Sequence, residues 1–337
     1  MYFCNKKQES MTENSYIKQF PDLMAGKKIL YVHGFASSGQ SGTVTRLRTV
    51  FPNATVIAPD LPIHPEEALS LLYNICKEEK PDLIIGTSMG GMFTEKLNGF
   101  DRICVNPAMQ MAETMKEHGM TGTQTFQNPR KDGIQEFYVD KALVKEYKGV
   151  TEKNFKGQNE EQHVWGLFGD EDTTVNTYDM FREHYPQATR FHGEHRMNDH
   201  SFMHSVVPVI RWIDDQQEKR QRPIIYICLP PAQGKGAMPA PSFQKAVRLL
   251  IERYQVYFVA HSLGEEAAWL AEYVGVPAWQ HFITTPRLDL LYGDYLIVPT
   301  NQKQQEGTSL CTLIELGSDT FKTWDDIIEY FARLGGQ

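Results

Sequence analysis

The residues that could do chemistry begin with Ser88, at the centre of a Gly-x-Ser-x-Gly motif over residues 86–90. The apolar residues Leu83 to Ile85 before the motif predict a buried strand, and we expect a helix from Met89 to about Leu97. A sharp turn between strand and helix would expose the serine hydroxyl at the N-terminus of the helix, where the helix dipole favours negative charge. The motif also occurs by chance, so the flanking strand and helix are what favour a nucleophilic serine.

A serine nucleophile needs a base to take its proton and an acid to orient that base. Asp172 and His195 follow Ser88 in the order Ser, acid, His that is typical of α/β-hydrolases, each just after an expected strand. Asp170 and Glu171 compete for the acid role. We favour Asp172 because the pattern Gly-x-x-Asp-x-x-Val is usual for the loop that carries this acid.

Three further histidines compete with His195 for the role of base. His192 ends an expected strand and is better explained by packing, whereas His200 and His204 stand four residues apart on the last expected helix of this region. That spacing also suits metal ligands, but no third ligand follows from the spacing, so we expect no metal. The oxyanion would be bound by backbone N–H groups of Met89, after the nucleophile, and of Phe35, after the first strand.

The elements that would position these residues alternate between strand and helix over residues 28–217. The pattern predicts a doubly wound parallel sheet with strands at about 27–33, 54–58, 83–85, 102–105, 163–168 and 188–192. Residues 107–160 interrupt it, and no strand is evident there, so we expect a helical cap over Ser88. Its methionines and three aromatic residues could line an acyl pocket or simply pack the cap on the sheet: Met109, Met111, Met115, Met120, Phe126, Phe137 and Tyr138.

Residues 28–215 resemble the YqiA-type esterases of the α/β-hydrolase superfamily. The resemblance rests on segments 30–38, 85–91, 105–108, 169–172 and 193–196, which occur in the same order. It implies the hydrolysis of a small carboxylic ester or thioester without a cofactor. It does not identify the acyl group.

A charged segment over residues 218–223 predicts a linker, after which strands and helices alternate again over residues 224–337. Residues 224–334 resemble the 5'(3')-deoxyribonucleotidases of the haloacid-dehalogenase-like superfamily, most clearly in segments 293–297, 313–318 and 321–325. The resemblance implies that every aligned catalytic position is altered and that the domain is a pseudoenzyme. The altered positions are Cys228 for the nucleophile, Pro230 for the acid/base, Val298 and Pro299 for the metal ligands, and Arg287 or Leu288 for the phosphate-binding lysine. Asp294 is retained, but in the family it belongs to a structural turn.

The composition excludes several other classes of protein. The chain has 337 residues and a net charge of −8 without a basic stripe, so we expect no binding to nucleic acid. No apolar run is long enough to span a membrane. The five cysteines are scattered and odd in number, as expected for reduced thiols. Residues 1–27 read as a polar tail without a signal peptide, which favours a cytoplasmic protein; translation from Met11 is an alternative start.

Together these features predict an α/β-hydrolase domain at residues 28–217, followed by a haloacid-dehalogenase-like domain at 224–337. The predicted function is a carboxylesterase-type serine hydrolase with a catalytically inactive second domain. The alternatives are a non-catalytic two-domain scaffold and a bifunctional esterase and phosphatase.

Overall fold

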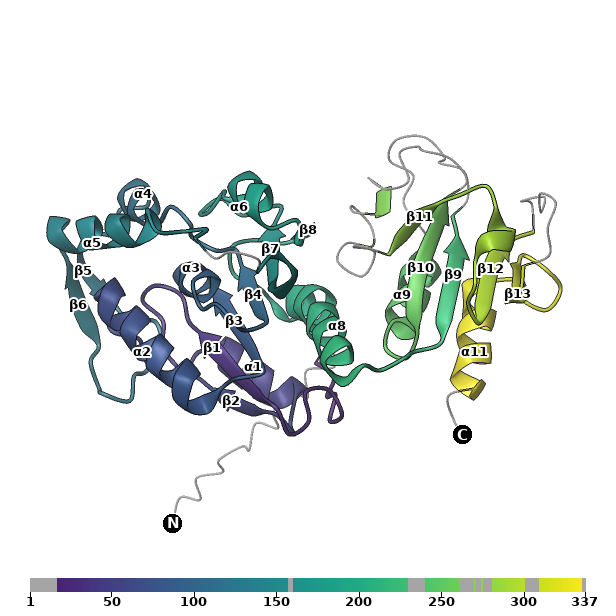
Figure 1. The fold of residues 1–337 in the computed structure, drawn as a ribbon, viewed down its shortest axis with the longest axis horizontal. Coiled ribbons are helices and arrows are strands. Elements are labelled where there is room, and N and C mark those ends of the chain that lie inside the picture. The colour runs from purple at the N-terminus through teal and green to yellow at the C-terminus, as the bar shows by residue number, and fades with distance from the viewer. Residues whose placement is uncertain are drawn as a thin grey trace, which may run out of the picture.

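The computed structural model describes residues 17–156, 160–229, 240–260, 269–270, 274, 281–300 and 309–334. Figure 1 shows two α/β units, each built around its own sheet and joined by the chain that leaves helix α8. We call the described residues 17–219 the N-terminal unit and those from 224 onward the C-terminal unit. The domain boundaries themselves stay a prediction.

The N-terminal unit contains a six-stranded parallel sheet in the order β2-β1-β3-β4-β7-β8. Its strands are apolar runs with few exposed positions, as expected where helices cover both faces. The sequence therefore places them well, with ends that differ by at most two residues. Their bounds are β1 Lys28–Val32, β2 Thr55–Ile57, β3 Leu83–Thr87, β4 Arg102–Val105, β7 Val164–Gly169 and β8 Ala188–Phe191.

Two apolar clusters lie on opposite faces of this sheet because successive strand residues point to opposite sides. Leu30 and Ile84 pack in the cluster that includes residues of helices α2, α3 and α6, whereas Ile29 and Leu83 pack with helices α1 and α8. The helices are α1 Gly42–Val50, α2 Pro65–Glu79, α3 Met89–Glu95, α6 Tyr178–His184, α7 Asp199–Ser201 and α8 Val207–Glu218. A π-helical turn, Phe202–Val206, joins the last two.

The insertion between β4 and β7 is not purely helical, so the prediction that it contains no strand is wrong. It consists of α4 Met111–Glu117, an antiparallel hairpin of β5 Gly122–Thr125 and β6 Glu136–Val139, and α5 Lys141–Thr151. In the hairpin only alternate residues of β6 are buried, and β5 is a short polar strand. Such a strand lacks the apolar run that marks the strands of the main sheet. A 3₁₀ turn, Glu161–His163, then leads into β7.

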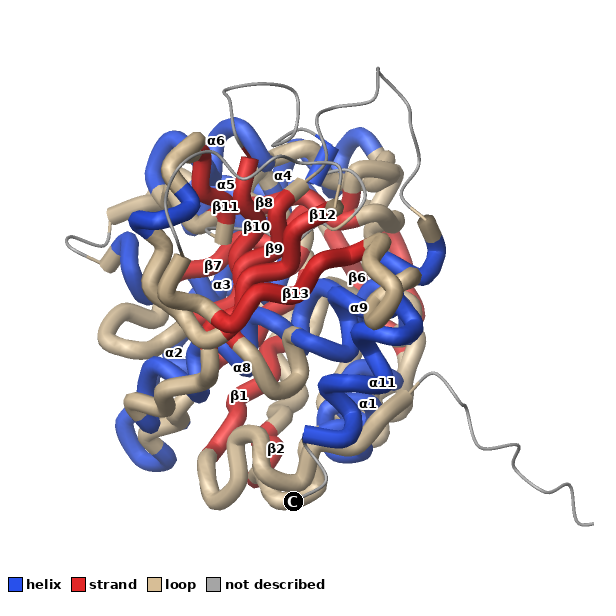
Figure 2. Tube along the Cα trace, turned by 90° about the vertical axis from the view of Figure 1, so that its right-hand side faces the viewer, coloured by secondary structure: helices blue, strands red, loops and turns tan. Residues whose placement is uncertain are grey.

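The C-terminal unit has a five-stranded parallel sheet in the order β11-β10-β9-β12-β13, which Figure 2 shows with this unit nearest the viewer. Helices α9 and α11 pack together on one face of it. The sequence also predicts a helix over residues 265–274, which lies mostly outside the described residues. The bounds are β9 Ile224–Cys228, α9 Pro241–Leu250, β10 Gln255–Ala260, β11 Phe282–Thr284, the 3₁₀ turn Leu288–Leu290, β12 Tyr295–Pro299, β13 Thr312–Leu316 and α11 Trp324–Leu334.

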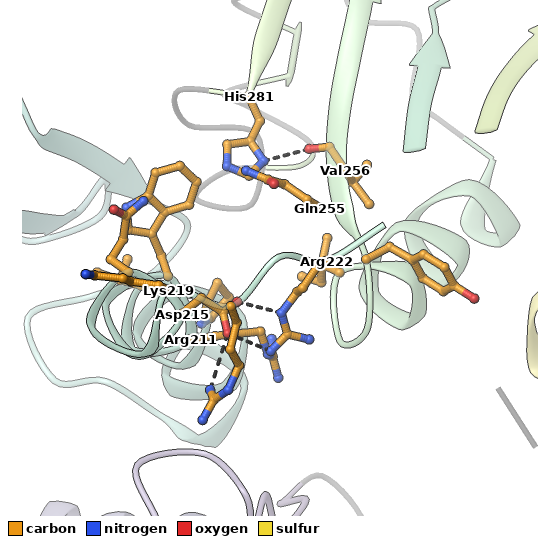
Figure 3. Close-up of a pocket in the computed structure, with 14 residues that line it drawn as sticks. Arg211, Asp215, Lys219, Arg222, Gln255, Val256 and His281 are labelled. Atoms are coloured by element: carbon orange, nitrogen blue, oxygen red, sulfur yellow. Dashed lines mark hydrogen bonds and ion pairs between the residues drawn. The ribbon is translucent and has the colours of Figure 1, made fainter. Parts of the chain in front are cut away.

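The two units contact each other along helix α8. The ring of Trp212 on this helix lies 4.8 Å from the ring of His281 in the C-terminal unit, measured between centroids. Arg222 in the connection bonds back to Asp215 on α8 through both Nε and Nη2. A cavity opens beside these contacts (Figure 3).

None of the helices in the described ranges combines the length and apolar character that crossing a bilayer requires.

Candidate active site

Ser88 occupies a strained turn between β3 and α3. Its backbone angles are φ 55° and ψ −121°, a sparsely populated region for a residue with a side chain. Such strain costs on the order of 1–3 kcal/mol and persists only where the surroundings impose it. The chain on both sides of Ser88 is tightly packed. A Cβ on Gly86 would lie 2.3 Å from the Gly90 oxygen, and a Cβ on Gly90 would lie 2.1 Å from the Val32 oxygen, so neither position has room for a side chain. The two glycines of the motif therefore allow the turn to pack against β1.

The structure brings Ser88, His195 and Asp172 together in one hydrogen-bonded chain. The Nδ1 atom of His195 lies 2.7 Å from Asp172 Oδ2, and Nε2 lies 3.0 Å from Ser88 Oγ. An ionised carboxylate only accepts, so Nδ1 carries the proton and Nε2 accepts from the serine hydroxyl. The Asp172 side chain is only 3% exposed, and its Oδ1 accepts from the backbone N–H groups of Thr174 and Val175 at 2.8 and 2.9 Å. The carboxylate is thus fixed on the side away from the histidine.

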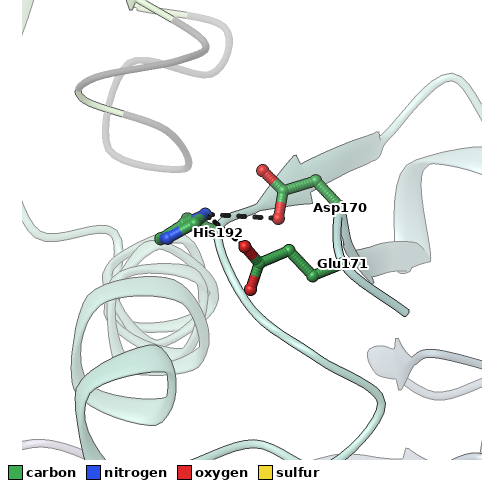
Figure 4. A group of neighbouring side chains, drawn as sticks. All are labelled: Asp170, Glu171 and His192. Atoms are coloured by element: carbon green, nitrogen blue, oxygen red, sulfur yellow. Dashed lines mark ion pairs between the residues drawn. The ribbon is translucent and has the colours of Figure 1, made fainter. Parts of the chain in front are cut away.

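The two other acids of this loop contact His192 instead of His195. Asp170 Oδ1 accepts from the Gly193 N–H at 3.0 Å and lies 3.4 Å from His192 Nδ1, while Glu171 lies 3.9 Å from the same nitrogen (Figure 4). His192 is exposed, whereas the sequence suggested that it would be packed in the core. Among the described residues these three side chains also form the one grouping that could hold a cation, but all three are exposed, as surface acids commonly are.

His200 and His204 lie against each other, with ring centroids 4.4 Å apart. Burial and the nearby Arg248 lower the pKa of His204 to about 4, so this ring is neutral at physiological pH. Neither histidine contacts Ser88 in the structure, which places His195 alone among the four candidates beside the serine.

The two residues expected to donate to an oxyanion are both near Ser88 in the fold: Met89 follows it directly, and Phe35 follows Gly34. A Cβ on Gly34 would lie 3.3 Å from Ser88 Cβ, so the loop after β1 packs directly against the turn that carries Ser88. The backbone N–H groups of Phe35 and Met89 are both without a hydrogen-bond partner among the described residues.

His33, which sequence reasoning did not single out, fixes the loop that carries Phe35. Its side chain is buried; Nδ1 donates to the Gly34 oxygen at 2.8 Å, and Nε2 accepts from the Leu61 N–H at 3.0 Å. Burial lowers the pKa of His33 to about 4. A neutral imidazole is required here because one nitrogen must accept. The signal in the sequence was a histidine at the end of the first strand, directly before the loop.

Asn106 was likewise missed as a positioning residue. It lies at the end of β4 with φ 43°, and its Nδ2 donates to the backbone oxygens of Glu194 and His195 at 3.2 and 3.0 Å. Its Oδ1 accepts from the Gly169 N–H at 2.7 Å. One buried amide thus ties the loop with Asp172 to the loop with His195. The Asn-Pro pair that closes this strand was the available signal.

The cavity at Ser88 has a more polar lining than the methionine and aromatic residues of the cap suggested. The hydroxyl and amide groups include Ser41, Thr43, Gln124, Gln127, Asn128 and Thr173, with Arg46 and Arg196 among the charged residues. Of the cap residues expected at an acyl pocket, only Met120 lines it. Met109, Met111, Met115 and Phe137 are buried in the core, Phe126 packs against that core, and Tyr138 is exposed. These side chains hold the cap on the sheet.

Comparisons with solved structures find α/β-hydrolases. Est1E from Butyrivibrio proteoclasticus is 15% identical, with a TM-score of 0.37 and coverage of 60% of this chain and 91% of that one. The thioesterase domain from the curacin biosynthetic pathway is 15% identical, with a TM-score of 0.34 and coverage of 58% and 92%. The methylesterase MES16 from Arabidopsis is 11% identical, with a TM-score of 0.34 and coverage of 58% and 100%. Identities and TM-scores this low carry no activity over to this chain.

The parallel, doubly wound sheet of the N-terminal unit agrees with the expected α/β-hydrolase fold. None of these comparisons shows a haloacid-dehalogenase-like fold for the C-terminal unit. Residues 28–211, more than half of the chain, match the model of a family described as "Uncharacterised protein family (UPF0227)", over nearly the whole segment that resembles the YqiA-type esterases. The chain therefore belongs to the uncharacterised protein family UPF0227.

Proposed function

We propose that this protein is a serine hydrolase that cleaves carboxylic esters or thioesters through Ser88, His195 and Asp172. The observation that carries the proposal is the hydrogen-bonded chain from Asp172 Oδ2 through His195 to Ser88 Oγ, with distances of 2.7 and 3.0 Å. The strained backbone of Ser88 supports it, because such strain is characteristic of a nucleophile held on a strand-to-helix turn.

In the proposed reaction, Ser88 Oγ attacks the acyl carbon while His195 Nε2 takes the hydroxyl proton. Asp172 holds the ring and stabilises the imidazolium that forms. The tetrahedral intermediate collapses as its bond to the alcohol or thiol breaks, and His195 returns the proton to that leaving group. Water then attacks the acyl-enzyme with His195 as base, which releases the carboxylic acid and restores the Ser88 hydroxyl.

The negative charge on the tetrahedral oxygen would be bound by the backbone N–H groups of Phe35 and Met89. Neither group makes a hydrogen bond to another described residue; Phe35 lies in the loop that His33 fixes, and Met89 is the first residue of α3. Fixed donors at the developing oxyanion contribute about 3–4 kcal/mol each to the lowering of the barrier in serine hydrolases.

The lining of the cavity favours a short or polar substrate over a long acyl chain. Hydroxyl and amide groups, together with Arg46 and Arg196, offer hydrogen bonds to a substrate that carries oxygen atoms. A long hydrocarbon chain would leave those groups without partners, which costs on the order of 1–3 kcal/mol for each buried group.

Covalent labelling with a fluorophosphonate tests this function against the alternative of a two-domain scaffold. The wild type should be labelled, whereas Ser88→Ala and His195→Ala should lose both the label and the hydrolysis of p-nitrophenyl acetate. His200→Ala is the matched control and should keep both. A wild type that is folded but not labelled would favour the scaffold.

We further propose that the C-terminal unit is a catalytically inactive relative of the haloacid-dehalogenase-like nucleotidases. Its sheet order places β9 next to β12, so Cys228, Val298 and Pro299 lie together at the carboxyl edge where such sheets bind ligands. None of them is a carboxylate. Burial raises the pKa of Cys228 to about 12, so its thiol stays protonated and is a poor nucleophile. Pro230 lies outside the described residues.

A further inference from the structure

The cavity between the two units is lined by basic and aromatic side chains that the proposed hydrolase chemistry does not use. Helix α8 and the chain that follows it provide Arg211, Trp212, Lys219 and Arg222, and the C-terminal unit provides Tyr254 and His281. Figure 3 shows the cationic groups gathered around Asp215 on one side and His281 with Gln255 on the other. The cavity shares no lining residue with the one at Ser88.

Arg211 is the unusual member of this set. The residue is only 7% exposed, yet its guanidinium makes no hydrogen bond or ion pair with another described residue. Its one recorded contact is with the ring of Phe20, 4.9 Å from the guanidinium carbon. Burial lowers the pKa of Arg211 to about 10, so the group remains charged at neutral pH. A buried charge is normally paired, and this one has five N–H donors to satisfy.

The acid nearest to Arg211 in the lining is already engaged by other arginines. Asp215 accepts from Arg222 Nε at 2.5 Å and Nη2 at 2.9 Å, and from Arg220 at 3.4 Å. The lining contains four cationic residues and a single acid. Arg220 also pairs with Asp214 outside the lining, whereas Arg211 and Lys219 form no ion pair with a described residue, which leaves an excess of positive charge. An added oxyanion would compensate that excess and provide the missing acceptor for Arg211.

The lining of the cavity also offers aromatic and apolar side chains. The ring of Trp212 lies 4.8 Å from the ring of His281, and Ile251 and Tyr254 continue the lining. His281 is held by an Nδ1–H bond to the Val256 oxygen at 2.6 Å. An aromatic or short apolar group could pack against these side chains while an attached oxyanion reaches Arg211.

We propose that this cavity binds a small organic molecule in which a phosphate or carboxylate group contacts Arg211 and an apolar ring packs beside Trp212. Both oxyanions offer two oxygen atoms that can accept two parallel hydrogen bonds from one guanidinium group, and this bidentate contact is the chemistry that they share. The site lies where β10 begins, at Gln255 and Val256, and not at the carboxyl edge that carries Cys228. It is therefore separate from both the hydrolase site and the degenerate nucleotidase-like site.

Calorimetric titration of the full chain with phenyl phosphate, benzoate, inorganic phosphate and benzyl alcohol tests the proposal. Phenyl phosphate and benzoate differ in their anionic group, so their affinities show whether the site prefers phosphate or carboxylate. The one with the higher affinity should also bind more tightly than inorganic phosphate. Benzyl alcohol should not bind, because it lacks the charge. Ser88→Ala should bind as the wild type does, which separates this site from the hydrolase site.

Arg211→Met keeps the length and the apolar stem of the side chain and should weaken binding of the better anion by about tenfold or more. Arg333→Met is the matched control, since this arginine lies exposed on α11, and it should leave binding unchanged. Lys219→Met alters an exposed side chain of the cavity, so it should fold even if Arg211→Met does not, and it should weaken binding severalfold. Absence of binding by all anions, or binding unchanged in both cavity variants, would overturn the proposal.

Discussion

Single residues of the Asp172 loop differ sharply in their surroundings although they are neighbours in sequence. Asp172 is buried, bonded to two backbone N–H groups and to His195, whereas Asp170 and Glu171 are exposed near His192. A carboxylate that is fixed by backbone donors holds the imidazole in one orientation and one tautomer. The two exposed acids lack any contact with His195 through which they could do so.

This difference predicts unequal effects of removing each charge. Asp172→Asn should lower kcat by about 10⁴, because the amide no longer favours the tautomer with the proton on Nδ1. Asp170→Asn and Glu171→Gln should change kcat only slightly. Steady-state kinetics on p-nitrophenyl acetate measures all three, and a ranking in which Asp170→Asn is the most damaging would move the acid to that position.

His33 makes the stability of the fold depend on pH. Its pKa falls from 6.5 in the unfolded chain to about 4 in the folded protein, so the unfolded state binds more protons between these values. Stability is therefore complete above pH 6.5 and is lost as the pH falls toward 4. From pH 7 to pH 5 the loss due to His33 is about 2 kcal/mol.

Urea unfolding at pH 7 and pH 5 checks this expectation. His33→Gln retains a possible acceptor for the Leu61 N–H and should show a smaller loss of unfolding free energy between the two pH values than the wild type. His118→Gln replaces an exposed histidine and serves as control. Equal losses in the wild type and His33→Gln would contradict the assignment.

At the scale of elements, the cap shapes the entrance to Ser88. Its helices α4 and α5 contribute their apolar side chains to the core, whereas β5 and the turn that follows it contribute Gln124, Thr125, Gln127 and Asn128 to the cavity. Phe126, in the same turn, does not line the cavity; its ring packs on Phe137, with ring centroids 4.6 Å apart. The cap thus presents polar groups to a substrate and keeps its apolar groups for its own packing.

A series of p-nitrophenyl esters from acetate to decanoate tests what this arrangement implies. We expect kcat/KM to be highest for the shortest acyl chains, because longer chains would cover hydroxyl and amide groups without satisfying them. Gln124→Leu should reduce the difference in kcat/KM between the acetate and octanoate esters. A rise in kcat/KM with chain length in the wild type would show that the polar lining does not select the substrate.

At the scale of the whole molecule, two parallel sheets carry different residues at their carboxyl edges. The N-terminal sheet presents Ser88 directly after β3, while the C-terminal sheet has a buried thiol and apolar residues as the last residues of β9 and β12. Phosphoryl transfer of the nucleotidase kind depends on metal ions and charged groups around the transferred phosphate. Cys228, Val298 and Pro299 supply neither.

The full chain should therefore release no phosphate from dUMP or dTMP, with or without Mg²⁺. Phosphate release is measured colorimetrically, and Ser88→Ala is included so that any turnover can be assigned to the C-terminal unit. Metal-dependent turnover that disappears in Cys228→Ser would identify the protein as a bifunctional hydrolase.

The sequence determined the main sheet because buried parallel strands are continuous apolar runs. Such runs can be recognised from the local sequence alone, without knowing which strands pair. The bounds of β4 agree with the sequence-based expectation, and all six strands of the main sheet lie where the sequence predicts them. It failed for the β5–β6 hairpin, whose polar strand is stabilised by pairing with β6 and by Phe137 packing into the core. Such a strand depends on contacts across the chain and leaves little local pattern.

Only the tertiary structure decided which side chains meet. Ser88 and His195 are 107 residues apart, and the choice among Asp170, Glu171 and Asp172 depends on how one turn directs each carboxylate. His33 and Asn106 act through backbone groups of distant loops, which sequence spacing does not encode. Arg211 reads in sequence as one more polar residue on an amphipathic helix. Its burial beside the cavity and its contact with the Phe20 ring depend on how α8 packs in the assembled fold, which the local sequence does not encode.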